Sequence, residues 1–253
     1  MAKLADRYRE MMALRGEGLR RYRANEFSTI SGPPCNLSLP RIELSKHAGL
    51  APKIALGPFS IFDRPPLWAF AERALRRFDR RVRVLEIGPG SGVLATYLQG
   101  LLGDRIESYF ALERDPSFTG PYERVSRLEE IKIPVDVIIA SEVAEHMSSD
   151  DWYECIVLPI KEIASPDASL IMSVPNPTSP GGIARDFTHA QNYPWYDLYA
   201  LMRLEFADVD IHRAYYAWSA QRLAFLLPRI LICHLIELDW CDTLICTASR
   251  IYK

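Results

Sequence analysis

An excess of charge of one sign is missing from this chain. Thirty basic residues stand against thirty-two acidic ones among its 253 residues, so the formal net charge is −2 at pH 7. A protein that binds nucleic acid through many phosphates needs a basic surface to attract the polyanion. The composition therefore argues against nucleic acid as a partner.

Paired cysteines and an export signal are missing as well. The five cysteines are scattered and form no C-x-x-C pair, the spacing typical of zinc and redox sites. Residues 1–10 are charged throughout and lack the apolar core of a secretory signal. We therefore expect reduced thiols and a cytoplasmic location.

No stretch has the uninterrupted apolar character of a membrane span. Residues 219–238 are strongly apolar, but Arg222, Pro228, Arg229 and His234 interrupt them. Three interpretations stay open for this stretch: interior packing, a substrate lid, or contact with a membrane surface.

The length and the 49% hydrophobic composition suit one large α/β domain with a sizeable core. Its most informative feature is an apolar run over residues 82–87 that ends in three glycines at alternate positions, Gly88, Gly90 and Gly92. This pattern predicts a buried strand, a tight turn and then a helix over residues 91–102. Glycines in such a turn let the backbone approach a ligand, and the N–H groups at the helix start favour polar or anionic groups.

The spacing of the turn separates it from other nucleotide folds. It is G-x-G-x-G with Glu86 two residues before the first glycine, whereas the dinucleotide fingerprint is G-x-G-x-x-G. A second predicted strand, residues 106–112, runs into A-L-E-R-D at residues 111–115. Together these segments resemble the class I S-adenosylmethionine-dependent methyltransferases, in which the turn faces the methionine end of the cofactor. Glu113 holds the place of the acid that binds the ribose hydroxyls.

The resemblance implies a fold and a cofactor site. The fold is a Rossmann-like seven-stranded α/β sheet with the last strand antiparallel, in a domain of residues 61–253. Residues 1–60 are expected to form a helical cap and a linker. The cofactor is S-adenosylmethionine, and the expected binding residues are Glu86, Gly88, Pro89, Gly90, Ser91, Gly92, Glu113, Arg114, Ser141 and Glu142.

Other elements follow from local patterns. We predict helices over residues 67–78, 150–164 and 195–204, the second with caps at Ser149, Asp150 and Asp151 and a kink at Pro159. Strands are predicted over residues 135–140, 169–177, 209–218 and 243–250. The interval between Glu113 and Asp136 is too short for the usual helix, strand and helix. The adenine-binding residues therefore stay unassigned, with Leu128 and Glu129 as candidates.

A cluster of acidic and imidazole side chains is expected after the fourth strand of the family fold. Glu142, Glu145 and His146 stand at i, i+3 and i+4 and share a face if the chain turns helical there. His189 follows the fifth strand, where the family brings polar groups over the pocket. Methyl transfer needs alignment, exclusion of water and, for a hydroxyl acceptor, a base. His146, His189 and Glu142 are the catalytic candidates.

The same side chains suggest a metal. Glu142, Glu145, His146 and His189 form a mixed oxygen and nitrogen ligand set that could hold a divalent ion. The motif resembles the E-x-x-E-H of small-RNA 3′-terminal 2′-O-methyltransferases, and Thr188-His189 matches a dipeptide of relatives in ubiquinone biosynthesis. The competing interpretation is that a histidine acts as a plain general base.

The sequence thus predicts a methyltransferase that acts on oxygen of a small, partly apolar metabolite. The alternatives are a metal-assisted RNA 3′-terminal 2′-O-methyltransferase, a non-catalytic scaffold of the same fold, and a nicotinamide oxidoreductase, which the glycine spacing disfavours. A lid or a larger core is expected from the apolar residues that flank the domain, namely Phe59, Ile61, Phe62, Trp195, Tyr196 and residues 225–236.

Overall fold

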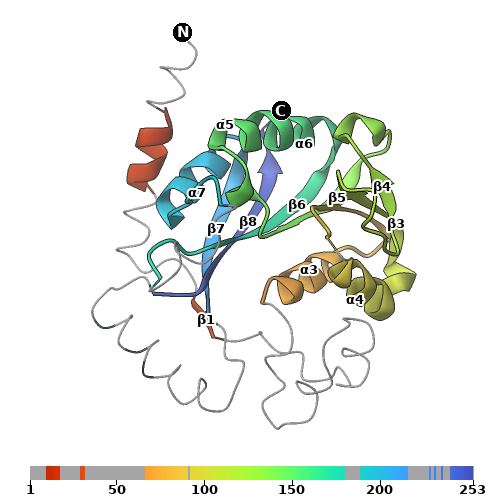
Figure 1. The fold of residues 1–253 in the computed structure, drawn as a ribbon, viewed down its shortest axis with the longest axis horizontal. Helices are drawn as coiled ribbons and strands as arrows, with labels where there is room; N and C mark the ends of the chain where they lie inside the picture. Colours follow the sequence, from red (N-terminus) through yellow and green to blue (C-terminus); the bar gives the residue numbers. More distant parts are fainter. Residues whose placement is uncertain are drawn as a thin grey trace.

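The computed structural model describes residues 10–17, 29–31, 66–90, 92–179, 189–215, 228, 231, 235 and 240–252. Their centre is one eight-stranded sheet with the order β1-β7-β8-β6-β5-β2-β3-β4 (Figure 1). Its strands are β1 (Thr29–Ser31), β2 (Val82–Ile87), β3 (Ile106–Leu112), β4 (Glu123–Val125), β5 (Val135–Ser141), β6 (Ala164–Pro175), β7 (Phe206–Tyr215) and β8 (Thr243–Ile251).

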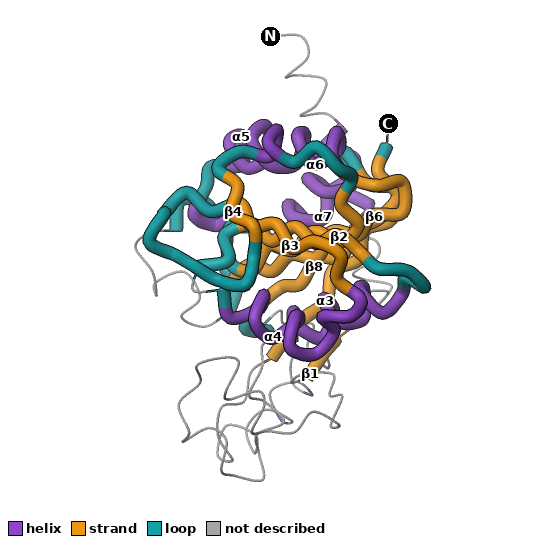
Figure 2. The backbone as a smooth tube through the Cα atoms, turned by 90° about the vertical axis from the view of Figure 1, so that its right-hand side faces the viewer, coloured by secondary structure: helices purple, strands orange, loops and turns teal. Residues whose placement is uncertain are grey.

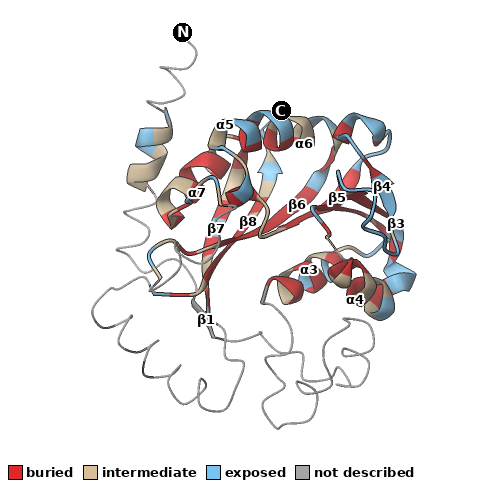
Figure 3. Cartoon of the chain, viewed as in Figure 1, coloured by how far each residue is buried: buried red, intermediate tan, exposed pale blue. Residues whose placement is uncertain are grey.

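Helices cover both faces of the sheet (Figure 2). On one face lie α3 (Pro66–Arg77) and α4 (Val93–Leu102), and on the other α5 (Ser149–Trp152), α6 (Leu158–Ile163) and α7 (Trp195–Arg203). β2 serves both cores because its side chains alternate: Val84 packs with α3 and α4, and Leu85 packs with the opposite layer. The buried residues accordingly follow the strands and the inner helix faces (Figure 3).

The strand pairing confirms the predicted Rossmann-like sheet with its last strand antiparallel. β8 pairs antiparallel with both β6 and β7, whereas every other neighbouring pair is parallel. The carboxyl ends of all strands except β8 therefore meet at one edge of the sheet, and this edge is where open α/β sheets bind their ligands.

An eighth strand extends the predicted seven. β1 pairs parallel with β7, with Ile30 opposite Ala214. The sequence predicted an irregular linker here, because a three-residue strand in a segment rich in proline, glycine and serine has no alternation to detect. The strand forms because it pairs with the edge of β7, a tertiary contact that the local sequence does not reveal.

The connection between β3 and β5 is short, as its length predicted. All of residues 113–134 are described, and they form only β4 and a 3-10 turn at Leu128–Glu130. The helix that usually joins the second and third strands of such a sheet is replaced by turns and irregular backbone over residues 113–122.

The predicted helix over residues 150–164 is divided into three parts. α5 and α6 are separated by one π-helical turn, Tyr153–Val157, and Pro159 is the second residue of α6. Proline cannot donate a backbone hydrogen bond and clashes with the carbonyl four residues earlier, so a wider turn accommodates it. The cap is Ser148, whose Oγ accepts a hydrogen bond from the Asp151 amide at 3.1 Å, and the predicted cap at Ser149 to Asp151 is wrong.

The helix at residues 10–17 lies against α7. Arg15 Nε lies 3.1 Å from Asp197 Oδ1, and the Tyr199 hydroxyl donates to Glu17 Oε1 at 2.6 Å. One arginine of the basic N-terminal stretch is thus engaged within the chain. Among the residues that the structure describes, none of the helices has both the length and the apolar character needed to cross a membrane.

Candidate active site

The glycine turn after β2 forms as predicted. Gly88, Gly90 and Gly92 have φ angles of 63°, 51° and 70°, a region that other residues rarely adopt. The Gly88 amide donates to Leu112 O at 3.0 Å, and the Gly92 amide donates to Pro89 O at 2.9 Å. These bonds fasten the turn to the end of β3 and close it on itself. Ser91 lies outside the described residues.

The three glycines differ in what surrounds them. A Cβ atom on Gly88 would lie 2.7 Å from Val143 Cγ2, whereas a Cβ atom on Gly90 would meet none of the described residues within 4 Å. The turn is therefore packed on one side and open at Gly90. Gly92 is the N-cap residue of α4, and among the described residues no side chain caps this helix, so its first amides can serve a polar ligand.

Glu86 is buried beneath the turn on the α4 side of the sheet. It is 2% exposed and accepts a hydrogen bond from the Tyr109 hydroxyl at 2.7 Å. Burial raises the pKa of its carboxyl to about 7, against the opposing effect of this hydrogen bond. A carboxyl with a pKa near 7 is partly protonated at neutral pH, and a cationic ligand nearby would favour its ionised form.

Glu113 stands at the carboxyl end of β3, beside the glycine turn. Its amide donates to Val125 O at 3.1 Å, and its Oε1 accepts from the Asp115 amide at 2.9 Å. The carboxylate is therefore held in place at the edge where the ribose is expected. Arg114 is exposed. Of the two adenine candidates, Leu128 is buried in the core at 3% exposure, and Glu129 is exposed.

Glu142 follows Ser141 at the end of β5 in an unusual conformation. Its φ is 53°, and its amide donates to Ser173 O at 3.1 Å. Burial raises the pKa of the Glu142 carboxyl to about 7, and a hydrogen bond with Ser173 lowers it in part. Within the described part of the chain, Oε1 of this carboxyl is buried without a hydrogen-bond partner. Left-handed backbone at a non-glycine residue and an unpaired buried oxygen are both features that cluster at functional sites.

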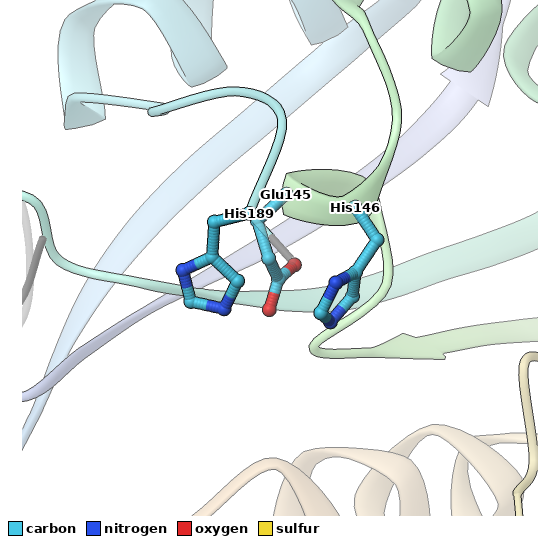
Figure 4. Close-up of side chains that lie close together, drawn as sticks. All are labelled: Glu145, His146 and His189. Carbon is cyan, nitrogen blue, oxygen red and sulfur yellow. The ribbon is translucent and has the colours of Figure 1, made fainter. Parts of the chain in front are cut away.

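Three of the predicted metal ligands come together (Figure 4). The ligand atoms of Glu145, His146 and His189 all lie within 4.8 Å of one another, and the two imidazole rings meet edge to face with centroids 5.0 Å apart. The amides of Ala190 and Gln191 donate to Glu145 O at 2.7 and 3.0 Å. These bonds bring the His189 segment against the loop after β5. Three donors of oxygen and nitrogen type could hold a divalent ion and leave positions open.

Glu142 is not part of this group. The expected helix over residues 142–146 is a 3-10 turn, Ala144–His146, and Glu142 precedes it in left-handed backbone. The i, i+3 and i+4 positions therefore do not share a face, and the sequence spacing was wrong on this point. Thr188 lies outside the described residues.

The predicted lid residues fall into different places. Trp195 is 6% exposed within the hydrophobic core, and Arg15 lies over the Tyr196 ring with its Cζ 4.4 Å from the centroid. Leu231 and Leu235 are exposed. Phe59, Ile61, Phe62 and most of residues 225–236 lie outside the described part of the chain.

Sequence reasoning missed two side chains that border this edge. Ser173, at the end of β6, contacts Glu142, and Tyr122, in the short connection after β3, lies against Gly92. The only signal for Ser173 was its place at the end of a strand, and a tyrosine in an irregular loop gives no periodic signal.

Structural comparison identifies the fold. A SAM-dependent methyltransferase from Archaeoglobus fulgidus superposes with a TM-score of 0.52 at 20% identity, covering 72% of this chain and 94% of that one. The small-RNA methyltransferase HEN1 superposes with a TM-score of 0.50 at 15% identity, covering 74% of this chain and 25% of that one. By sequence, no protein-family model and no curated protein matches. The sheet order, the glycine turn and these superpositions together give the chain the fold of the class I S-adenosylmethionine-dependent methyltransferases.

Proposed function

We propose that the protein is an S-adenosylmethionine-dependent methyltransferase that acts on oxygen of a small, partly apolar metabolite. The observation that carries this proposal is the glycine turn, whose open side at Gly90 lies between the carboxyl ends of β3 and β5. Glu113 and Glu142 follow those two strands. A side chain at Gly90 would fill space that the turn leaves free, which is the fit expected for a bound cofactor.

The residues around the turn have separate tasks in this proposal. The backbone of Gly88, Pro89, Gly90 and Gly92 would hold the amino-acid half of the cofactor, and Glu113 would accept hydrogen bonds from the ribose hydroxyls. The cofactor supplies an electrophilic methyl group on a sulfonium. The protein aligns the acceptor with that group and excludes water.

An oxygen acceptor is favoured by the bases beside the turn. A hydroxyl must lose its proton as the methyl is transferred, and imidazole or carboxylate groups serve as general bases. Glu142, His146 and His189 supply both kinds at one edge of the sheet. The apolar character of the acceptor rests on the composition of residues 59–62 and 225–236. Exposed Leu231 and Leu235 are also consistent with contact at a membrane surface, and a cytoplasmic location stays a prediction.

A divalent metal at Glu145, His146 and His189 is a proposal of its own. Their donor set fits an ion that accepts nitrogen and oxygen ligands. Such an ion would orient an acceptor oxygen and lower its pKa. In that case Glu145, His146 and His189 hold the ion, and Glu142 is left as the base.

This group also favours a second function, 2′-O-methylation at an RNA 3′ end, because Glu145 and His146 belong to the E-x-x-E-H segment that begins at Glu142, and His189 is the later histidine of that resemblance. The net charge of −2 weighs against it. Protein–RNA affinity that depends on several phosphates falls steeply with salt. Equal activity at 50 and 300 mM salt, or no transfer to RNA at all, would remove this alternative.

Calorimetry with S-adenosylhomocysteine tests the main proposal. We expect one site per chain in the wild type and none in Gly90→Arg, with circular dichroism to show that the variant is folded. A folded wild type that binds no S-adenosylhomocysteine would support the scaffold alternative. Incubation with cell extract and isotope-labelled cofactor, followed by mass spectrometry, would identify the methylated product and the atom that carries the methyl.

A further inference from the structure

Tyr122 lies beside the glycine turn, in the connection after β3 that lacks the usual helix. It ends the irregular connection after β3, and its amide donates to Gly120 O at 2.8 Å. A Cβ atom on Gly92 would lie 3.0 Å from Tyr122 Cε1, and one on Gly120 would lie 2.2 Å from the same atom. Two glycines therefore make room for this one ring, which packs with the α3 and α4 side of the core.

The loop that carries Tyr122 is fastened to α4. The Gln99 side-chain amide donates to Pro121 O, one residue before the tyrosine. The ring is thus held between the start of α4 and the end of β3, the two elements that border the proposed cofactor site.

The hydroxyl of Tyr122 has an unusual environment. Among the residues that the structure describes, it is a buried oxygen without a hydrogen-bond partner. Burial raises the pKa of Tyr122, and the negative charges of Glu113 and then Glu86 raise it further. The hydroxyl therefore stays protonated and lies in the field of the two acidic residues that flank the glycine turn.

A buried hydroxyl without a partner costs stability unless something else binds it. The charges of Glu113 and Glu86 act on this hydroxyl, and its ring packs with the α3 and α4 core, whereas Ala144, next to Glu145, belongs to the core on the opposite face. A neutral phenol can both donate and accept, which suits a ribose hydroxyl that already donates to a neighbouring carboxylate.

We propose that the Tyr122 hydroxyl binds the nucleoside half of the cofactor and forms, with Glu113, the site for its ribose. This inference rests on the proposed function. It also explains the short connection, because the Tyr122 ring would border the cofactor site on the side where the usual helix is missing.

Tyr122→Phe tests the inference because it removes the hydroxyl and keeps the ring. The probes are S-adenosylhomocysteine and 5′-deoxy-5′-methylthioadenosine, which lacks the amino-acid half, both titrated by calorimetry. We expect the affinity for both probes to fall by the same factor, about three- to tenfold for one hydrogen bond. The Tm of the free protein should stay unchanged or rise, since no partner is lost.

Tyr153→Phe is the matched control. Its hydroxyl donates to Glu205 on the opposite face of the sheet, so the same chemical change should lower the Tm and leave the affinity for both probes within about twofold.

Three other results would contradict the inference. Unchanged affinity in Tyr122→Phe, or a fall in Tm like that of Tyr153→Phe, would make the hydroxyl structural. A loss confined to S-adenosylhomocysteine would place it at the amino-acid half and overturn the ribose assignment. A folded wild type that binds neither probe would overturn the proposed function, and this inference with it.

Discussion

Val143 packs directly against Gly88, so closely that a Cβ atom on the glycine would lie 2.7 Å from Val143 Cγ2. One contact thereby joins the turn after β2 to the loop after β5. The first segment carries the proposed cofactor site, and the second carries Glu142, Glu145 and His146. Their relative position depends on the absence of a side chain at residue 88.

We expect Gly88→Ala to lower the free energy of unfolding by about 2–5 kcal/mol. The left-handed φ costs about 1–2 kcal/mol, and the clash with Val143 adds the cost of overpacking, about 1–3 kcal/mol. Urea unfolding measures the loss. Adding Val143→Ala should recover part of it, since the clashing methyl groups are removed.

Gly90→Ala is the control for that prediction. Its φ of 51° imposes a similar backbone strain, but in the described part of the chain no atom lies within 4 Å of the new methyl. We expect a loss of only about 1–2 kcal/mol, together with weaker binding of S-adenosylhomocysteine. Equal stability losses in the two alanine variants would contradict the importance of the Val143 contact.

The sequence predicted those features that depend on local pattern. Alternation of apolar residues placed β3 at Ile106–Leu112, and alternate glycines placed the turn. It could not predict β1 or the ring of Tyr122 against Gly92, because both depend on residues far away in the chain. It also grouped Glu142 with Glu145 and His146, since helical spacing cannot reveal a single left-handed residue that redirects the chain.

Asp136 anchors the amino end of β5, and its loss should destabilise the fold. It is 1% exposed, receives two hydrogen bonds from Arg80 at 2.7 and 3.0 Å, and accepts the Arg83 amide at 2.9 Å. We expect Asp136→Asn to cost about 2–3 kcal/mol at pH 7, the range for hydrogen bonds to a charged group.

The pH dependence gives a second measurement on Asp136. Burial pushes its pKa up, but Arg80 and the Arg83 amide outweigh burial and lower it. A depressed pKa stabilises the fold above the unfolded value of about 3.9, and the effect is lost as pH falls through the folded pKa. The stability difference between wild type and Asp136→Asn should therefore shrink below pH 4. A difference that is constant from pH 3 to 7 would show that the charge does not matter.

Glu142 should have the opposite effect on stability. Its pKa is raised to about 7, so between about pH 4.3 and 7 the folded state binds more protons than the unfolded one, and stability falls as pH rises. We expect Glu142→Gln to be more stable than wild type at pH 8, by on the order of 3 kcal/mol, and equal to it at pH 4. Methyl transfer should fall in the same variant. A variant that is less stable at pH 8 would contradict the raised pKa.

Metal binding can be measured without knowledge of the acceptor. We expect the wild type to bind one Mn²⁺ per chain in calorimetric titration. Glu145→Gln and His189→Asn should each lower the affinity for Mn²⁺ about tenfold or more, the effect of losing a metal ligand or a residue that holds one in place. Glu142→Gln is the control, because Glu142 lies outside the group whose ligand atoms approach within 4.8 Å. Absence of Mn²⁺ binding in the wild type would leave the histidines as plain bases.

Trp195 and Tyr196 can decide between a lid and a core at the start of α7. Trp195 is 6% exposed in the same core cluster as Leu198, whereas Tyr196 is only partly buried and lies beneath Arg15. We expect Trp195→Ala to lower the free energy of unfolding by about 3–5 kcal/mol, the cost of a large cavity. Tyr196→Ala should cost only about 1–2 kcal/mol, because the partly buried ring gives up its cation–π contact with Arg15 and its edge-to-face contact with Trp195. Differential scanning calorimetry measures both losses.

A core role predicts that S-adenosylhomocysteine affinity in Trp195→Ala falls together with the Tm. If the Tm is kept and only use of the acceptor is lost, Trp195 belongs to a lid, because a lid residue contributes to the ligand pocket and little to the packed interior.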